Sequence, residues 1–269
     1  MLRTDLHLLS KEDNLLLVGT ADGKLVIFKD TTVKYQDGAP VKVVEIGDIS
    51  TPLVCLSISS ILGQVTYWAG CGTKVVSLNC DFTVQKMMET KTRPLRQQKC
   101  NNGNIITMVI DNYIYLVKKG SHVVELWDKN VDKISLIIDC ASVLKNDTYS
   151  ARVKALHLQK GTTLWIGTGG GDIILFDLST HQPICVLDTF CHSIRSMVTI
   201  QIEKECHCTV LLILGNVNKD YFEDDKWQKE EQSQLFVWDM SLPYEIQNLK
   251  NHNDIRREIT TKMRSGSLK

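Results

Sequence analysis

A pair of apolar segments recurs five times along the chain, and this recurrence limits the possible folds more than any other feature. In each pair, an apolar run leads into small, polar or glycine residues, and a second apolar run follows, usually closing in an aromatic residue and an aspartate. The residues that end the second run lie 50, 49, 49 and 62 positions apart; they are Phe28, Leu78, Trp127, Phe176 and Trp238. Spacing this regular indicates a repeat protein.

Each repeat has room for two more strands. Further segments precede the pair, as at 104–111, and follow it, as at 133–139. The central pair is nearly all apolar, as expected of strands that are buried on both faces, whereas the flanking segments alternate or are more polar. Four short strands per repeat, graded from buried to exposed, are typical of a β-propeller blade. The sequence therefore predicts an all-β propeller with five readable four-stranded blades.

Composition narrows the function classes. The chain has 269 residues, with 31 basic and 31 acidic side chains and a formal net charge of zero, so no electrostatic footprint for nucleic acid is expected. The apolar runs are shorter than the ~20 residues that a membrane helix needs, so no membrane insertion is expected. Charges near the amino terminus disfavour a signal peptide, which favours the cytoplasm. Nine cysteines, an odd number, favour reduced buried thiols over a disulfide framework.

The dipeptides that close two of the repeats resemble the signature of WD40 repeats. Trp127-Asp128 and Trp238-Asp239 match it, although the usual Gly-His dipeptide is absent from all five repeats. The chain is therefore similar to degenerate WD40 blades. Across nearly its whole length, above all in the Gly-rich hairpin and the tail, it resembles the carboxy-terminal WD40 domain of the Roco family of leucine-rich repeat serine/threonine kinases.

This resemblance implies seven blades, the first segment here, 5–10, being the first strand of the third. The chain is then expected to be an amino-terminally shortened propeller, residues 1–242, followed by a helix and tail, residues 243–269; a closed five-bladed propeller is the alternative. The resemblance also implies a parent protein with kinase and GTPase domains that bind ATP, GTP and Mg²⁺. No cofactor and no catalytic residue are expected in this chain.

The stretch Gly167-Thr168-Gly169-Gly170-Gly171-Asp172 raises the question of a nucleotide site. A dinucleotide fingerprint needs a third spaced glycine and a helix whose amino terminus meets the pyrophosphate. Here the last position is an aspartate, which would repel phosphate, and a strand-like run follows. The pattern instead predicts a hairpin turn between two buried strands, where glycine permits positive φ.

Metal binding and nucleophilic catalysis find little support. Cysteine and histidine gather in two short stretches, which contribute Cys191, His192, Cys206, His207 and Cys208. Their spacing is unusual for zinc, and no Cys-x-x-Cys or second histidine pair accompanies them, so packing cysteines are the favoured interpretation and no metal site is expected. The chain has no G-x-S-x-G elbow and no kinase signature.

A polar insertion at 216–234 lengthens the last repeat. It is acidic and amide-rich, and it contains Tyr221, Phe222 and Trp227. The sequence predicts a loop here. The loop either is only solvated or binds a partner, with these aromatic residues as anchors.

The tail contains the one helix that the sequence predicts. Asn253 can cap it, and Ile255, Ile259 and Met263 recur on one face. This face packs either on the propeller itself or, as the resemblance implies, on an adjoining kinase domain. The resemblance also implies a phosphorylation site read by adaptor proteins. Glycine replaces the expected threonine at position 266, so Ser265 and Ser267 are the candidates.

These patterns predict a protein-interaction and assembly module rather than an enzyme. The expected partners are proteins: a second copy of the chain, the adjoining kinase domain and adaptor proteins. The alternative is a purely structural propeller that stabilises the kinase through the tail helix. A propeller enzyme would need convergent polar groups on the inner strands, which are nearly all apolar. Cytoplasmic location is expected, with peripheral membrane association only through the parent protein.

Overall fold

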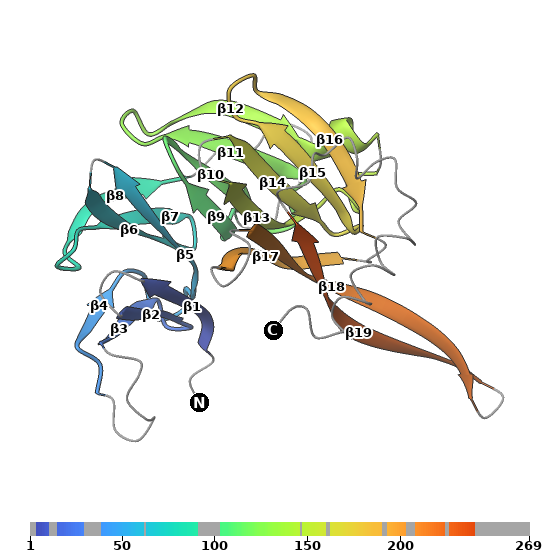
Figure 1. The fold of residues 1–269 in the computed structure, drawn as a ribbon. Coiled ribbons are helices and arrows are strands. Elements are labelled where there is room, and N and C mark those ends of the chain that lie inside the picture. The colour runs from blue at the N-terminus through green and yellow to red at the C-terminus, as the bar shows by residue number, and fades with distance from the viewer. Residues whose placement is uncertain are drawn as a thin grey trace.

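Five antiparallel sheets follow one another along an arc in the computed structural model (Figure 1). The structure describes residues 4–10, 15–29, 39–61, 63–90, 103–145, 147–159, 162–189, 193–202, 208–223 and 226–239. Within each sheet, the strands are consecutive in sequence and each pairs with the next. This is the predicted propeller arrangement, in which one repeat forms one blade.

The blades contain the following strands. The first has β1 (Thr4–Ser10), β2 (Leu15–Thr20), β3 (Lys24–Lys29) and β4 (Lys42–Glu45). The second has β5 (Leu53–Ile61), β6 (Gln64–Cys71), β7 (Lys74–Leu78) and β8 (Val84–Glu89). The third has β9 (Ile105–Ile110), β10 (Tyr113–Lys118), β11 (Val123–Asp128) and β12 (Lys133–Asp139). The fourth has β13 (Val153–Gln159), β14 (Thr163–Thr168), β15 (Asp172–Asp177) and β16 (Gln182–Asp188). The fifth has β17 (Ser193–Ile202), β18 (Cys208–Glu223) and β19 (Lys226–Asp239).

The first strand of each blade lies at the inner side of the arc. Strand β5 packs on β9, β9 on β13 and β13 on β17, while β1 packs on β5. Among the described strands, no comparable packing joins β17 back to β1. The five blades therefore form an arc and do not close into a five-membered ring through these strands. The tail predicted as a helix, and with it the boundary at residue 242, lies outside the described residues.

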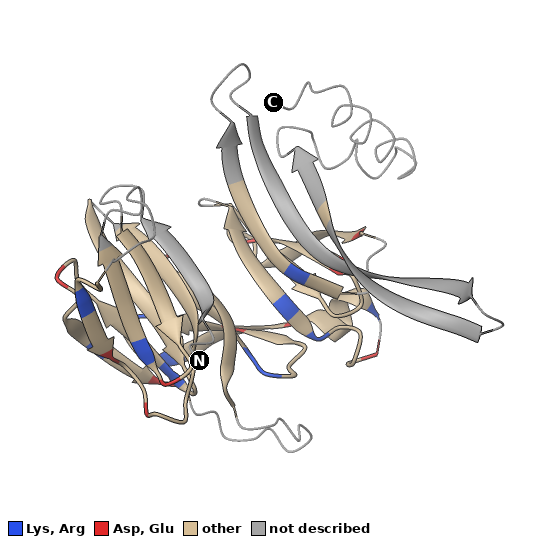
Figure 2. Cartoon of the chain, turned by 90° about the horizontal axis from the view of Figure 1, so that it is seen from below, with Lys and Arg blue, Asp and Glu red and all other residues tan. Residues whose placement is uncertain are grey.

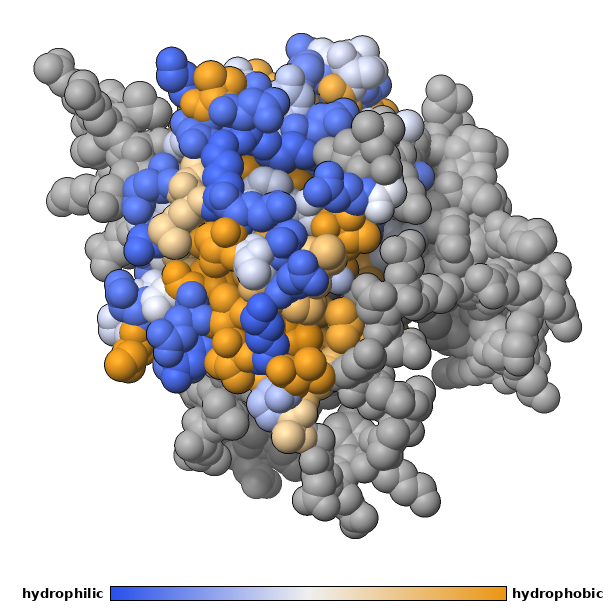
Figure 3. Space-filling view, turned by 90° about the vertical axis from the view of Figure 1, so that its left-hand side faces the viewer, coloured by the Kyte–Doolittle hydropathy of each residue, from blue (hydrophilic) through white to orange (hydrophobic). Residues whose placement is uncertain are grey.

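Burial follows the predicted gradient from inner to outer strands. In the first four blades the second and third strands are mostly buried, and all six residues of β14 are buried. The fourth strands expose alternate apolar side chains, including Val43, Val84, Met87 and Ile137. Figure 3 shows an apolar patch surrounded by hydrophilic residues on the side where the first two blades lie. The outer strands thus behave as half-solvated edges of the sheets.

A β-bulge recurs at the same place in every first strand. The pairing of the first with the second strand skips one residue just after the strand begins; the skipped residues are Asp5, Val54, Ile106, Lys154 and Arg195. A bulge adds twist and redirects a side chain. Its repetition shows that the five blades share their local backbone as well as their strand order.

The polar residue of the closing dipeptide shapes the turn between third and fourth strands. Asp128 accepts the backbone N–H of Asn130 at 2.7 Å, and Asp177 accepts that of Ser179 at 2.7 Å. Asn79 accepts the N–H of Thr83 at 2.8 Å in the second blade. Aspartate and asparagine favour such turns because their short side chains reach the backbone just ahead of them. This contact explains why the repeat ends in these residues.

The side chain of Trp127 in the third blade contacts both residues of a buried ion pair. Lys118 and Glu125 lie 3.1 Å apart between Nζ and Oε1, and their side chains are 8% and 13% exposed. The Trp127 Nε1–H donates to Glu125 Oε2 at 2.9 Å, and Lys118 donates to the Thr90 carbonyl of the preceding blade at 2.7 Å. The pair therefore links the second and third blades.

Blades approach closely where the second strand ends in glycine. A Cβ on Gly167 would lie 2.5 Å from Ile194 Cγ2 of the next blade, and one on Gly19 would lie 2.6 Å from Leu53 Cδ2. Neither distance is possible for real atoms, so the first apolar residue of each following blade sits against a bare backbone. The glycines recur here because the seam between blades has no room for a side chain.

The loop predicted over 216–234 is wrong. Strands β18 and β19 pair without interruption from Val210↔Asp239 to Glu223↔Lys226, so the insertion extends the hairpin into a long two-stranded ribbon. Its charges and amides suggested a loop, but strands pair through backbone N–H and C=O groups, which polar residues supply as well as apolar ones.

We predict that Glu125→Leu lowers the free energy of unfolding by about 3 kcal/mol, because it leaves Lys118 buried without its carboxylate. Urea unfolding measures the change. The double variant Lys118→Met/Glu125→Leu is the control and should recover most of the loss, since it removes both charges. A double variant as unstable as the single one would contradict this assignment.

We predict that Gly167→Ala destabilises the chain by about 2 kcal/mol through overpacking against Ile194. The matched control is Gly169→Ala, two residues along the same hairpin. Its Cβ would lie 3.3 Å from the flexible end of Lys154, which can move aside. Equal thermal unfolding midpoints for the two variants would show that the seam is not tightly packed.

Candidate functional site

The connections that carry exposed functional groups lie at one end of the blades. The second and third strands are joined at this end, and the first strands begin there, because Val153 pairs with Thr168 beside the hairpin of the fourth blade. We call this end the hairpin face. The connection from the third to the fourth blade, residues 140–152, also lies on it.

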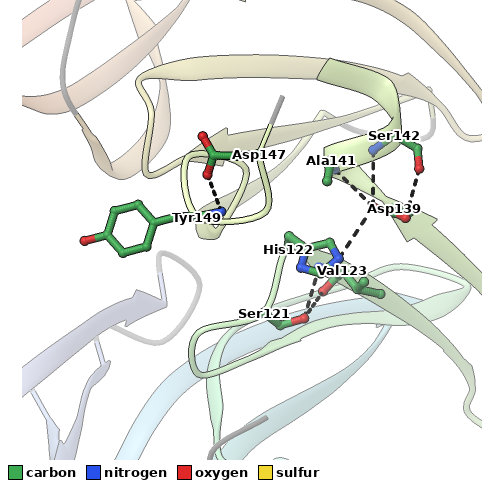
Figure 4. A network of polar contacts seen from close by, with 8 residues as sticks. All are labelled: Ser121, His122, Val123, Asp139, Ala141, Ser142, Asp147 and Tyr149. Atoms are coloured by element: carbon green, nitrogen blue, oxygen red, sulfur yellow. Dashed lines mark hydrogen bonds and ion pairs between the residues drawn. The ribbon is translucent and has the colours of Figure 1, made fainter. Parts of the chain in front are cut away.

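This connection begins with a short helix that the sequence analysis missed, α1 (Cys140–Leu144). Asp139 caps it by accepting the backbone N–H of Ala141 at 3.0 Å and that of Ser142 at 3.3 Å (Figure 4). His122 Nε2 lies 3.7 Å from the same carboxylate. Five residues are too few for an apolar periodicity to show, so the cap was the one sequence signal that could have revealed the helix.

A second carboxylate fixes the rest of the connection. Asp147 accepts the N–H of Tyr149 at 2.7 Å and that of Ser150 at 3.0 Å, and the Ser150 hydroxyl donates to it at 2.7 Å. These bonds, led by the Ser150 N–H, lower the pKa of Asp147, so the carboxylate stays charged. The segment is thus tied down beside Tyr149.

Tyr149 is held at the surface by this turn. Its side chain is 70% exposed, although it is a large aromatic residue, and Figure 4 shows it pointing away from the network. The Arg152 guanidinium lies 4.3 Å from the centre of its ring, a cation–π contact. An exposed aromatic ring on a fixed support is suited to anchor a protein partner.

The Gly-rich stretch is the hairpin that the sequence predicted. Gly171 has φ of +90°, a value that glycine adopts freely. The N–H groups of Gly169 and Gly170 donate to the carbonyls of Arg152 at 2.7 Å and Ser150 at 2.8 Å. These two amides hold the 147–152 segment against the hairpin, so they are not directed at a phosphate.

The aspartate after the glycines lies on the outer side of the hairpin. Asp172 is the register partner of Asp188 on β16. Burial first, and then the charge of Asp188, raise the pKa of Asp172. The carboxylate that ends the Gly-rich stretch therefore sits beside a second carboxylate rather than beside a helix terminus.

Basic side chains mark the starts of β13 and β17 on the hairpin face. Lys154 and Arg195 occupy the bulge positions of their strands, and both are exposed. Figure 2 shows basic positions on neighbouring strands in this half of the molecule. The sequence analysis missed this group because its members are distant in sequence and only the bulges bring them together.

His157 is the polar group that the inner strands β13 and β17 share. Its Nε2 contacts Thr199 Oγ1 across the seam. Burial lowers the pKa of His157 to about 4, so the ring is neutral near pH 7. A histidine held neutral in a seam is placed to join two blades rather than to shuttle protons.

The predicted interaction residues fall partly within the structure. Phe222 on β18 and Trp227 on β19 are register partners, and Tyr221 pairs with Gln228. Because Asn216 pairs with Ser193, where β17 begins, the ribbon extends beyond the hairpin face. The tail candidates lie outside the described residues; they are Ile255, Ile259, Met263, Ser265 and Ser267.

Most of the candidate metal ligands also lie outside the described residues. Cys191, His192, Cys206 and His207 lie outside the described residues, and Cys208 begins β18. Within the described part of the chain, no three His, Cys, Asp or Glu residues gather as a metal site would require. Nor does any helix in that part have the length and apolar character to cross a membrane.

Two comparisons with known proteins agree with this architecture. The family model described as the LRRK2 beta propeller matches residues 2–238. Among solved structures, the chain is similar to the Myceliophteria thermophila Cps50 (Swd1) beta-propeller domain, with a TM-score of 0.58 and 13% sequence identity over 87% of this chain and 72% of that one. At this identity the structural match supports the fold alone.

We predict that His157 makes the chain less stable as the pH falls from about 6.5 to about 4. The unfolded chain binds the proton near the ordinary pKa of 6.5, whereas the folded chain resists it until about 4. The contribution is thus complete above that ordinary pKa and lost below the folded one. Urea unfolding near pH 7 and pH 5 should give a smaller difference for His157→Gln than for the natural chain. His181→Gln, in an exposed turn, is the control and should leave the difference unchanged.

Proposed function

Because the chain belongs to the LRRK2 beta-propeller family, we propose that it works as a protein-interaction and assembly module and is not itself a catalyst. A propeller presents loops on rigid sheets, which makes them suited to recognise other proteins. The inner strands support this proposal, since their surroundings are mostly apolar and their shared histidine is neutral.

The observation that carries the proposal is Tyr149. Its ring is 70% exposed and the turn around Asp147 fixes its backbone. Because the neighbouring helix is capped and the Gly-rich hairpin holds the segment, little conformational entropy would be lost when a partner covers this surface. We therefore place the interaction surface on the hairpin face, around α1 and Tyr149.

The wider context follows from the family resemblance. We propose that the propeller is part of a larger Roco-type serine/threonine kinase with a GTPase domain, where ATP, GTP and Mg²⁺ bind outside this chain. Its partners would be a second copy, the adjoining kinase domain and adaptor proteins. The aromatic residues of the ribbon, Tyr221, Phe222 and Trp227, offer a second contact surface.

The structural alternative depends on the tail. A helix with Ile255, Ile259 and Met263 on one face would couple the propeller to the kinase domain, and Ser265 or Ser267 would regulate that coupling. These residues lie outside the described part of the chain, so this alternative stays a prediction.

We predict that the chain self-associates through the hairpin face. Light scattering over a concentration series should show a mass above that of the monomer, and Tyr149→Ser should weaken association about tenfold, the effect of removing an aromatic anchor. The matched control is Val131→Ser, which removes a 58% exposed side chain at the opposite end of the blades. A Tyr149→Ser variant that associates as the natural chain does would move the interaction surface elsewhere.

A further inference from the structure

Tyr149 differs from the other tyrosines whose burial the structure describes. Tyr67 and Tyr115 are 1% and 3% exposed, and Tyr113 is half-buried. Tyr149 is 70% exposed, and Figure 4 shows its side chain directed away from the surrounding polar network. Among these described tyrosines, its hydroxyl is therefore the one that an enzyme can reach in the folded chain.

Residues that precede Tyr149 are accessible as well. Lys145, Asp147 and Thr148 are all exposed. The core resumes at Ala151, which is fully buried. A modifying enzyme binds several residues around its target, and exposed connections between strands are the usual place for such contacts. The segment that contains Tyr149 therefore offers more than a single exposed ring.

The turn around Tyr149 is held by local bonds, which can open without disturbing a blade. The Asp147 carboxylate accepts the N–H groups of Tyr149 and Ser150, two and three residues further along the chain. The Ser150 hydroxyl donates to the same carboxylate, so this neighbouring hydroxyl is occupied. Bonds of this kind open locally at a fraction of the free energy of global unfolding. An enzyme can therefore draw Tyr149 into its active site while the propeller stays folded.

We propose that Tyr149 is a phosphorylation site for a protein tyrosine kinase, and that the phosphate keeps a partner from covering the hairpin face. This inference rests on the proposed function, because it assigns a regulatory step to the same interaction surface. In the reaction, the Tyr149 oxygen attacks the γ-phosphorus of Mg²⁺-bound ATP. The bond from that phosphorus to the β–γ bridging oxygen breaks, ADP leaves, and the phenol proton passes to a carboxylate base of the kinase.

The surroundings of Tyr149 determine what the phosphate does. The unmodified ring is an apolar anchor, whereas the phosphorylated one carries a charge of about −1.5 to −2 at pH 7. Asp147 stays ionised two residues away because its turn bonds lower its pKa, so the added charge meets a like charge. Arg152, whose guanidinium lies 4.3 Å from the ring centre, offsets part of this repulsion. A partner that covers the ring would have to desolvate the phosphate, which is unfavourable.

The test treats the full chain with Mg²⁺, ATP and the catalytic domain of a purified tyrosine kinase, and locates the phosphate by tandem mass spectrometry. We expect Tyr149 to be the main site on the folded chain, so that Tyr149→Phe removes most of the incorporated phosphate. The matched control is Tyr113→Phe, which removes a half-buried phenol from β10 and should leave incorporation unchanged. Thermal unfolding shows that each variant is folded.

Light scattering before and after kinase treatment measures the effect on self-association. Phosphorylation should weaken association of the natural chain at least about tenfold, as loss of the aromatic anchor does. Tyr149→Phe keeps the ring without the hydroxyl, so it should associate as the natural chain does and should not respond to the kinase.

Absence of phosphate at Tyr149 overturns the proposal and leaves the proposed function standing. Association that is unchanged by phosphate at Tyr149 overturns the regulatory effect in the same way. A natural chain that is already monomeric before treatment would contradict the proposed self-association and, with it, the regulatory effect, whereas the mass spectrum decides the modification site separately.

Discussion

The structure depends on how closely each blade approaches the one before it. At two seams, the first apolar residue of a blade rests on glycine: Leu53 lies over Gly19, and Ile194 lies over Gly167. Backbone bonds reinforce this packing, since the Ile105 N–H donates to the Gly72 carbonyl at 2.7 Å. Dispersion and burial act over short distances, so even one added methyl group would separate neighbouring sheets. The buried apolar residues accordingly form clusters that each span two neighbouring blades.

The hairpin face follows from this packing. Because each first strand starts beside the hairpin of the preceding blade, the connections between blades are held by backbone bonds, as Val153 N–H to Ser121 carbonyl at 2.9 Å illustrates. In the longer connection between the third and fourth blades, carboxylates also accept backbone N–H groups. Asp139 caps α1, and Asp147 stabilises the turn that contains Tyr149. Surface groups on this face are thus positioned by the core beneath them, which is what a recognition surface requires.

Sequence reasoning found most of the fold because apolar patterning decides it. The strand at 133–139 was predicted to the residue, and the Gly-rich stretch was correctly assigned to a hairpin. It failed for the ribbon, where pairing comes from the partner strand rather than from apolar residues. It also gave no sign that Lys154 and Arg195 occupy equivalent bulge positions in neighbouring blades, because the two residues are far apart in sequence. Strands can be predicted from the local apolar pattern, whereas residues brought together from different blades can be recognised only from the tertiary structure.

The shared bulge has a consequence for symmetry. Repetition makes the blades nearly equivalent around their common axis, and a ligand at the centre of equivalent blades could bind in several rotated orientations of equal energy. From the second to the fifth blade, the bulge position is filled in turn by Val54, Ile106, Lys154 and Arg195. These four residues change from apolar to cationic along the arc, so blades with the same backbone carry different side chains at this position. The repeated backbone is therefore uniform along the arc, whereas the side chains that it carries at this position are not.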